Sequence, residues 1–270
     1  MKVGRTIDQS IHDLREMDAL ASGHSPVHAR SAGAKLLVTA VFILTAASFG
    51  KYDLSGLIFM VFYPAVLFSL SGIPVSTCFY KLRYVLPLVC AVGLFNPFFD
   101  RTPAFAAGSF VVTGGMISML TLMVKGVLCL AASFLLAATT RIEAVCGALR
   151  KIRVPKLLVS LLLLTYRYAA VLAGEAAVMT DAYHLRAPGQ KGIHYSAWGS
   201  FFGQLMLRSV DRAGELYESM LLRGYDGEFY YAETGRWSAA DTVYVLLWCA
   251  FFAAARLFNL TRLLGGVLIR

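Results

Sequence analysis

Residues 110–138 read FVVTGGMISMLTLMVKGVLCLAASFLLAA, a stretch that is apolar except for Lys125. A helix crosses the hydrocarbon core of a bilayer with about 20 apolar residues, so this stretch is too long for one upright span. It fits a tilted helix, two broken helices, or a helix whose lysine turns toward protein or extends to the membrane surface. The stretch therefore indicates an integral membrane protein.

Further apolar runs predict an all-α integral membrane protein with about five transmembrane helices. Hydrophobic residues make up 58% of the chain and the mean hydropathy is +0.64, whereas a soluble domain has about 45–50% apolar residues. Pro87 and Pro97 would bend the third span or end it early. Besides the stretch above, the predicted spans are residues 35–50, 54–71, about 84–99 and about 239–257.

Basic residues cluster outside the apolar runs and give a formal net charge of +9. Nucleic-acid binding would also suit a basic chain, but these clusters alternate with apolar spans, as expected when positive charge is kept on the cytoplasmic side. We therefore expect the N-terminus and residues 139–236 in the cytoplasm. The tail with Arg256, Arg262 and Arg270 fits poorly outside, so either the tail folds back along the membrane or an odd number of spans is wrong.

The chain divides by composition into three parts. Residues 1–138 hold an N-terminal cytoplasmic segment and the first four spans, residues 139–236 form a cytoplasmic region of amphipathic helices, and residues 237–270 form the last span and the tail. The first thirty residues lack the apolar core of a signal peptide. The five cysteines are scattered, which suggests neither a disulfide framework nor a zinc site.

Two helices are predicted in the basic region. The first, about thirty residues long, starts at Pro155 and ends at Arg186, before Pro188 and Gly189. The second runs from about residue 201 to 223 and stops at Gly224. It carries an apolar stripe typical of a helix that lies against membrane or protein, namely Phe202, Leu205, Met206, Ala213, Leu216, Tyr217 and Met220.

The ends of these helices share a signature. DAYHLRAPG (181–189) and ESMLLRGYDG (218–227) each have an acid five residues before an arginine, a leucine directly before it and a small residue directly after it. One interpretation is a helix-terminal cation favoured by the macrodipole. The other is a pair of docking ends for a dimeric partner, since an arginine fork can hold a carboxylate by two hydrogen bonds.

Other classes of membrane protein lack their motifs here. An intramembrane enzyme could use Lys125, Arg141, Glu143 and the five histidines, but no HExxH, no GxSxG and no pair of intramembrane carboxylates is present. A self-sufficient transporter would place ionisable residues near mid-membrane. An ATPase would need a GxxxxGK[ST] loop, which the sequence lacks. For His12, His24 and His28 a solvated loop is expected rather than a metal contact, and His184 and His194 lack companion ligands.

The segment TTRIEAVCGALRKIRVPKLLVSLLLLTYRYAAVLAGEA (139–176) resembles the transmembrane T component of energy-coupling factor (ECF) transporters. The family pattern places a Thr-Thr pair, a leucine, Val-Pro, Arg-Tyr and a glutamate in that order, here Thr139, Thr140, Leu149, Val154, Pro155, Arg167, Tyr168 and Glu175. Its two X-Arg-X motifs match Leu185-Arg186-Ala187, which differs from the commoner Ala-Arg-Gly, and Leu222-Arg223-Gly224. HSPVHARSAGAKLLV (24–38) is similar to the family's entry to the first span, and the charged N-terminus resembles the cobalt-type CbiQ branch.

The resemblance implies a non-catalytic scaffold in the inner membrane of a prokaryote. It would join two cytoplasmic ATP-binding-cassette ATPases to a substrate-binding membrane subunit, most readily for cobalt, with nickel or a vitamin as alternatives. ATP and magnesium would bind the partner ATPases, and this chain would bind no cofactor or metal. By the same analogy, the two X-Arg-X motifs would contact the ATPases, while Pro155, Arg167 and Glu175 would support the first long helix.

Overall fold

The computed structural model describes residues 2–50, 53–83, 85–99, 103–107, 110–190, 192–227, 229 and 237–257. The chain forms two compact units. Unit 1 combines Met1–Leu20 with Arg141–Thr234, and unit 2 combines Ala21–Thr140 with Gly235–Arg270. The three-part division predicted from composition concerns membrane and cytoplasm, and it stays a prediction.

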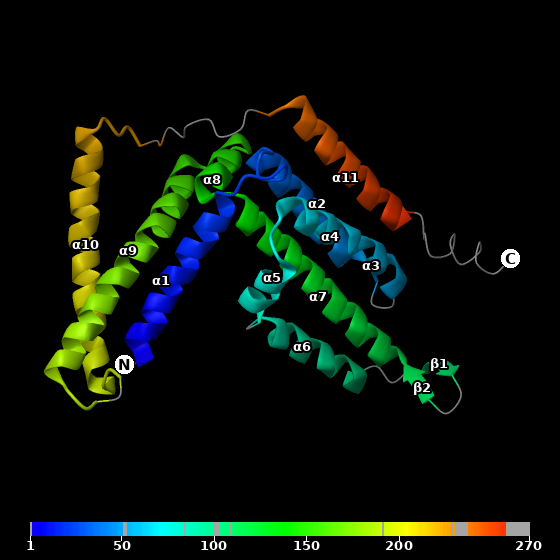
Figure 1. Cartoon of the computed structure of the whole chain (residues 1–270), viewed down its shortest axis with the longest axis horizontal. Helices are drawn as coiled ribbons and strands as arrows, with labels where there is room; N and C mark the ends of the chain where they lie inside the picture. The colour runs from blue at the N-terminus through cyan, green and yellow to red at the C-terminus, as the bar shows by residue number, and fades with distance from the viewer. Residues whose placement is uncertain are drawn as a thin grey trace. The chain divides into compact units, whose positions relative to one another are not determined.

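Unit 2 holds the predicted membrane spans (Figure 1). Among the described residues, α7 and α11 are long and apolar enough to cross a membrane, while α3–α4 and α5 together pass as one span bent by 115°. The helix α2 is apolar but shorter. The elements are α2 (Ala32–Ser48), α3 (Leu54–Met60), α4 (Phe62–Ser71), α5 (Val75–Leu82), α6 (Leu86–Phe99), β1 (Pro103–Ala107), β2 (Phe110–Thr113), α7 (Gly114–Thr139) and α11 (Ala239–Leu257).

The predicted all-α membrane fold is confirmed, with three local differences. Residues 110–113 pair antiparallel with β1, so α7 begins only at Gly114. The 14 residues of α6 extend about 21 Å, less than the roughly 30 Å of a hydrocarbon core. In unit 1, α9 (Lys156–Arg186) also has the length and composition of a span, although its sequence lies in the region expected in the cytoplasm.

Lys125 turns toward protein, which was one of the three alternatives for the long apolar stretch. Its ammonium group donates a hydrogen bond to the carbonyl oxygen of Phe49, just beyond the end of α2. The 26 residues of α7 extend about 39 Å, which suits a tilted helix. A structural role for this lysine is thus sufficient to explain its position.

The core of unit 2 is an aromatic cluster between α2, α4 and α11. The ring centroids of Phe42 and Tyr63 lie 4.7 Å apart, and those of Tyr63 and Trp248 lie 4.8 Å apart. Both distances are within the range in which aromatic pairs add about 0.5–1.5 kcal/mol beyond their buried area. Phe252 completes the cluster, and α2 packs against both α7 and α11. These contacts place α2 between α7 and α11 in the core of the unit.

Unit 1 consists of α1 (Lys2–Ala21), α8 (Ile142–Lys151), α9, a short 3₁₀ turn η1 (Tyr195–Ala197) and α10 (Trp198–Leu222). The hydroxyl of Tyr166 on α9 donates to the Asp18 carboxylate on α1 at 2.6 Å. A guanidinium nitrogen of Arg150 on α8 donates to the carbonyl oxygen of Phe229 at 3.3 Å. The first bond connects α1 to α9, and the second connects α8 to the segment after α10.

Candidate functional site at two helix ends

The long helix predicted in the basic region is α9, which has 31 residues and a length of about 46 Å. Pro155 precedes its first turn, where the missing N–H leaves no helical hydrogen bond unmade. A residue before proline avoids the helical region, and Ala187, before Pro188, leaves the helix with φ −125° and ψ 67°. One helix of about thirty residues is therefore confirmed, and Arg186 is its last residue.

The end of α9 is fixed by a side chain one turn earlier. The hydroxyl of Tyr183 donates to Oε1 of Gln190 at 2.8 Å and accepts from the backbone N–H of His194 at 3.2 Å. Leu185 is 84% exposed, and Arg186 is exposed beside it. Tyr183 thus holds the following loop against the helix while Leu185 and Arg186 remain accessible.

The end of α10 is fixed by the backbone. Gly224 has φ +80°, its N–H donates to the carbonyl of Leu221 at 2.9 Å, and the N–H of Tyr225 donates to the carbonyl of Met220 at 3.0 Å. This is a Schellman motif, in which glycine adopts the left-handed conformation without strain. Leu222 is 90% exposed, and Arg223 is the exposed C-cap residue.

Both ends therefore present an exposed leucine next to an exposed arginine. Within the part of the chain that the structure describes, the guanidinium groups of Arg186 and Arg223 have no hydrogen bond or ion pair. By contrast, Arg212 in the middle of α10 lies 3.9 Å from Glu215, in an exposed pair of the kind worth about 0.2–0.5 kcal/mol. The arrangement leaves two cations and two apolar side chains available for a partner.

The two signatures lie at opposite ends of α10. This helix has 25 residues, or about 37 Å, and it starts after the loop that follows α9. Figure 1 shows the chain reversing there, so that α10 runs back from the end of α9. A partner that contacts both signatures must therefore offer two sites far apart.

The predicted apolar stripe of α10 is divided in two by the structure. Leu205, Leu216 and Met220 are half-buried, and α10 contacts α9. The other members of the stripe are exposed, and no residue of α10 is buried. The exposed members, Phe202, Met206, Ala213 and Tyr217, form an apolar face that lipid or another protein would cover.

The supporting roles of Pro155, Arg167 and Glu175 remain predictions. Arg167 is exposed and Glu175 is half-buried, and among the described residues neither side chain has a hydrogen bond or ion pair. The tie that the structure does show for α9 is the neighbouring Tyr166, which sequence reasoning missed. Tyr183 was missed as well, although its position one helical turn before Arg186 was a readable signal.

The acid–base residues considered for an enzyme do not form a site. The ammonium group of Lys125 donates a hydrogen bond to a backbone carbonyl of unit 2, while Arg141 and Glu143 are exposed in unit 1. Burial and the nearby Glu143 raise the pKa of the Cys146 thiol. A reactive cysteine needs a lowered pKa, so Cys146 has the character of a structural residue.

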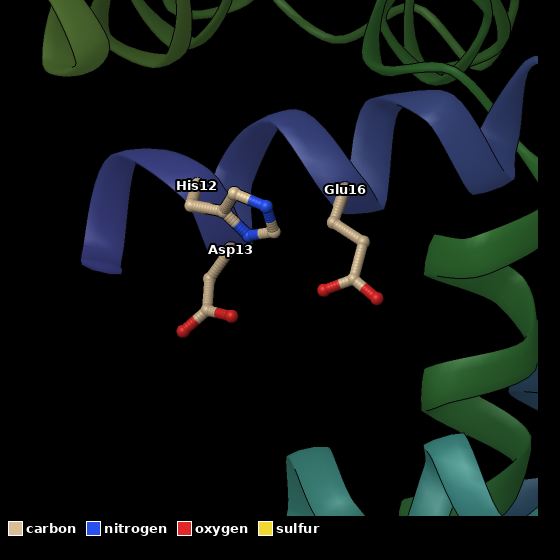
Figure 2. Close-up of side chains that lie close together, drawn as sticks. All are labelled: His12, Asp13 and Glu16. Atoms are coloured by element: carbon tan, nitrogen blue, oxygen red, sulfur yellow. The ribbon is translucent and has the colours of Figure 1, made fainter. Parts of the chain in front are cut away.

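One group of possible metal ligands lies on α1 (Figure 2). Ligand atoms of His12, Asp13 and Glu16 all lie within 4.8 Å of one another. His12 is thus on a helix rather than in the expected loop, whereas His24 and His28 lie in the non-helical segment after α1. All three ligands are exposed. Such exposed acidic groups are common without a bound ion.

Comparison with known proteins identifies a family. The family model CbiQ, described as cobalt transport protein, matches residues 23–231. An uncharacterized protein of Methanocaldococcus jannaschii is 23% identical over 236 residues, which is 83% of this chain and 80% of that protein.

Two relatives with named functions match a shorter segment. The cobalt transport protein CbiQ of Rhodobacter capsulatus is 36% identical over 96 residues, or 34% of this chain and 38% of that protein. The nickel permease LarQ of Lactiplantibacillus plantarum is 32% identical over 98 residues, or 36% of each chain. The matched segments therefore span little more than a third of these two relatives.

Proposed function

Since the chain belongs to the CbiQ family of cobalt transport proteins, we propose that it is the non-catalytic membrane scaffold of an ATP-driven ECF importer. In this proposal it joins two cytoplasmic ATPases to a substrate-binding membrane subunit and passes ATPase movement to that subunit. The family is one of membrane transport components, and the apolar helices make the chain a multi-pass membrane protein. The ATPases and the substrate-binding subunit are the partners that the proposal adds.

The observation that carries the proposal is the pair of exposed Leu-Arg ends. A leucine that is 84% or 90% exposed gains about 1.5–3 kcal/mol when it is fully buried. An adjacent arginine can hold a carboxylate of the partner through two charge-assisted hydrogen bonds. Two such ends, about 37 Å apart along α10, suit a dimer that offers two equivalent grooves.

Cobalt is the cargo that we favour, and nickel is the alternative. The family description and one relative name cobalt, while another relative is a nickel permease. A vitamin is a third candidate. In the proposed complex the cargo binds the partner membrane subunit, and ATP and magnesium bind the ATPases, because this sequence has no phosphate-binding GxxxxGK[ST] loop.

The test is purification of the tagged chain from its native membrane, followed by identification of the bound proteins and analysis of their metal content. We expect two ATPase subunits, one further membrane protein and cobalt. Reconstituted vesicles should then take up cobalt only when ATP is present. A complex that contains the membrane partner but no ATPase, or uptake that proceeds without ATP, would contradict the proposal.

The proposal also fixes the orientation of the chain. The Lys and Arg excess predicts that the N-terminus and residues 139–236 face the cytoplasm. In a cysteine-free background, single cysteines at Ser10 and Gln190 should react with a membrane-impermeant reagent only after the cells are opened. Labelling of either position in intact cells would overturn this orientation.

A further inference from the structure

Polar residues meet at three helix ends of unit 2, where Ser31, Lys35, Thr139 and Asp241 are buried and Ser238 is exposed. They come from the start of α2, the end of α7 and the start of α11, and we name this set the polar clasp: Ser31, Lys35, Thr139, Ser238 and Asp241. The chain passes between the two units beside Leu20, Thr140 and Thr234. The end of α7 and the start of α11 lie within five residues of a crossing, and α2 begins eleven residues after one.

Asp241 joins the beginnings of two helices. Its side chain is 3% exposed. Oδ1 accepts from the backbone N–H of Ser31, the N-cap of α2, at 3.3 Å, and Oδ2 accepts from the backbone N–H of Ser238, before α11, at 3.0 Å. A carboxylate is favourable at a helix N-terminus because unpaired N–H groups point toward it. Here one carboxylate serves two such termini.

Lys35 makes the matching contact with the third helix. Its side chain is 5% exposed, and its ammonium group donates to the carbonyl oxygen of Thr139 at 2.7 Å. Thr139 is the last residue of α7, where unpaired carbonyls attract a cation. The negative charge of Asp241 also attracts Lys35. Anion and cation thus lie at the helix ends of matching polarity.

Both charges are buried near the start of α2 without a direct ion pair among the described residues, so each offsets part of the cost of burying the other through space. Removing one leaves the other buried without a nearby opposite charge, whereas replacing both by neutral groups can be nearly neutral for stability. Buried charges of this kind have a well-attested use, which is to specify one register of packed helices. The clasp can form only when all three helix ends are in their observed register.

A second polar contact extends the connection by one helical turn. Thr39 Oγ1 lies 3.2 Å from the hydroxyl of Tyr63 on α4. Thr39 is four residues after Lys35, so both lie on the same face of α2. The polar contacts thereby connect α4 to the three helices of the clasp.

We propose that Lys35 and Asp241 are positioning residues that keep these helix ends in one register, so that unit 2 moves as one body when unit 1 is driven by ATP hydrolysis. This inference rests on the proposed function. The force would enter unit 2 through its three chain connections, and the clasp spans the helices that follow or precede them. Loosening the clasp would let one helix end move without the others.

The test compares three variants of the full chain in the reconstituted complex: Lys35→Met, Asp241→Asn and the double change. Each single variant should unfold at a lower temperature than the wild type, and the double variant should recover much of that loss. The double variant should still bind the ATPases, since Arg186 and Arg223 are unchanged. Its uptake of cobalt per ATP hydrolysed should fall several-fold, because one helix end can then move without the others.

Thr140→Val is the matched control. Thr140 follows the clasp in sequence, and its hydroxyl is buried without a hydrogen-bond partner among the described residues. Removing this hydroxyl should leave the unfolding temperature and the uptake per ATP unchanged or slightly raised. A large loss in this variant would mean that any change at this junction disturbs transport.

The outcomes separate the two proposals. If the double variant couples ATP hydrolysis to uptake as well as the wild type does, the clasp is structural only and the inference is wrong. If both single variants unfold like the wild type, the charges are independent and the inference is also wrong. If the wild-type complex itself shows no ATP-dependent uptake, the proposed function fails instead.

Discussion

The ends of α9 and α10 carry the same Leu-Arg-small signature but are built in different ways. At α9 the helix stops before Pro188, and the hydroxyl of Tyr183 holds the following loop. At α10 the helix stops at Gly224, and two backbone hydrogen bonds close a Schellman motif. The two helix ends therefore share their exposed side chains but differ in the contacts that fix their backbones. Their backbones are positioned by two independent devices, which can be disrupted separately.

The largest effect is expected when both arginines are reversed in charge. Loss of one partner from a buried charge-assisted pair typically costs about 2–5 kcal/mol, whereas an exposed pair is worth about 0–1 kcal/mol. Arg186→Glu with Arg223→Glu should therefore abolish co-purification of the ATPases, and each single change should weaken it. Arg208→Glu on the same helix is the control and should be mild. If the double variant assembles and transports normally, neither arginine binds the ATPases, and both are simply cations at helix ends.

The leucines should matter for binding but not for folding. Leu185 and Leu222 are so exposed that truncation removes little buried area from the free chain. If both are buried in the complex, Leu→Ala should cost about 1.5–3 kcal/mol of affinity at each end, or roughly a 10- to 150-fold loss. Titration of the ATPases against each variant measures this loss, and the thermal midpoint of the free chain serves as its control. Unchanged affinity would mean that the leucines lie outside the interface.

Gly224→Ala tests the Schellman motif that ends α10. A Cβ at this position would meet no atom within 4 Å, so the effect comes from φ +80° alone and should destabilise by about 1–2 kcal/mol. Gly214 is the matched control, because it lies inside α10 with equally open surroundings. Gly214→Ala should stabilise by up to about 1 kcal/mol. Thermal midpoints of the two variants should shift in opposite directions.

Tyr183→Phe tests the device of α9. The change removes the hydroxyl bonds to Gln190 and His194, which are exposed, so a loss of about 0.5–1.5 kcal/mol per bond is an upper estimate. ATPase affinity should fall with Tyr183→Phe if the loop must be held for Arg186 to dock. Normal affinity together with faster hydrogen exchange in residues 187–194 would show that docking does not need the loop.

The smallest and least local effects are expected at Glu175 and Arg167. They lie eleven and nineteen residues before Arg186, or about 16 and 28 Å along the helix. Glu175→Gln and Arg167→Gln should lower expression and assembly together, because their predicted role is support of α9. Normal expression with a selective loss of ATPase binding would move these residues to the interface.

Much of the candidate site was readable from neighbouring residues. Pro155 and Pro188 bracket α9 within one or two residues because proline acts on the backbone beside it. The start of α10 was less exact: it begins at Trp198 rather than near residue 201, since the Trp198 ring already stacks on Phe202 one turn later. The contacts of Tyr183 were missed because they depend on the path of the loop.

Hydropathy and helix termination depend on residues close in the chain, so the membrane character, the long helix and the place of the Leu-Arg signature at two helix ends could be predicted from the sequence. Which distant residues form hydrogen bonds depends on the tertiary structure. Asp241 meets Ser31 across 210 positions, Lys35 meets Thr139 across 104, and Tyr166 meets Asp18 across 148. A lone acid or lysine in the first turn of an apolar helix does not reveal its partner, since the partner is fixed by how whole helices pack.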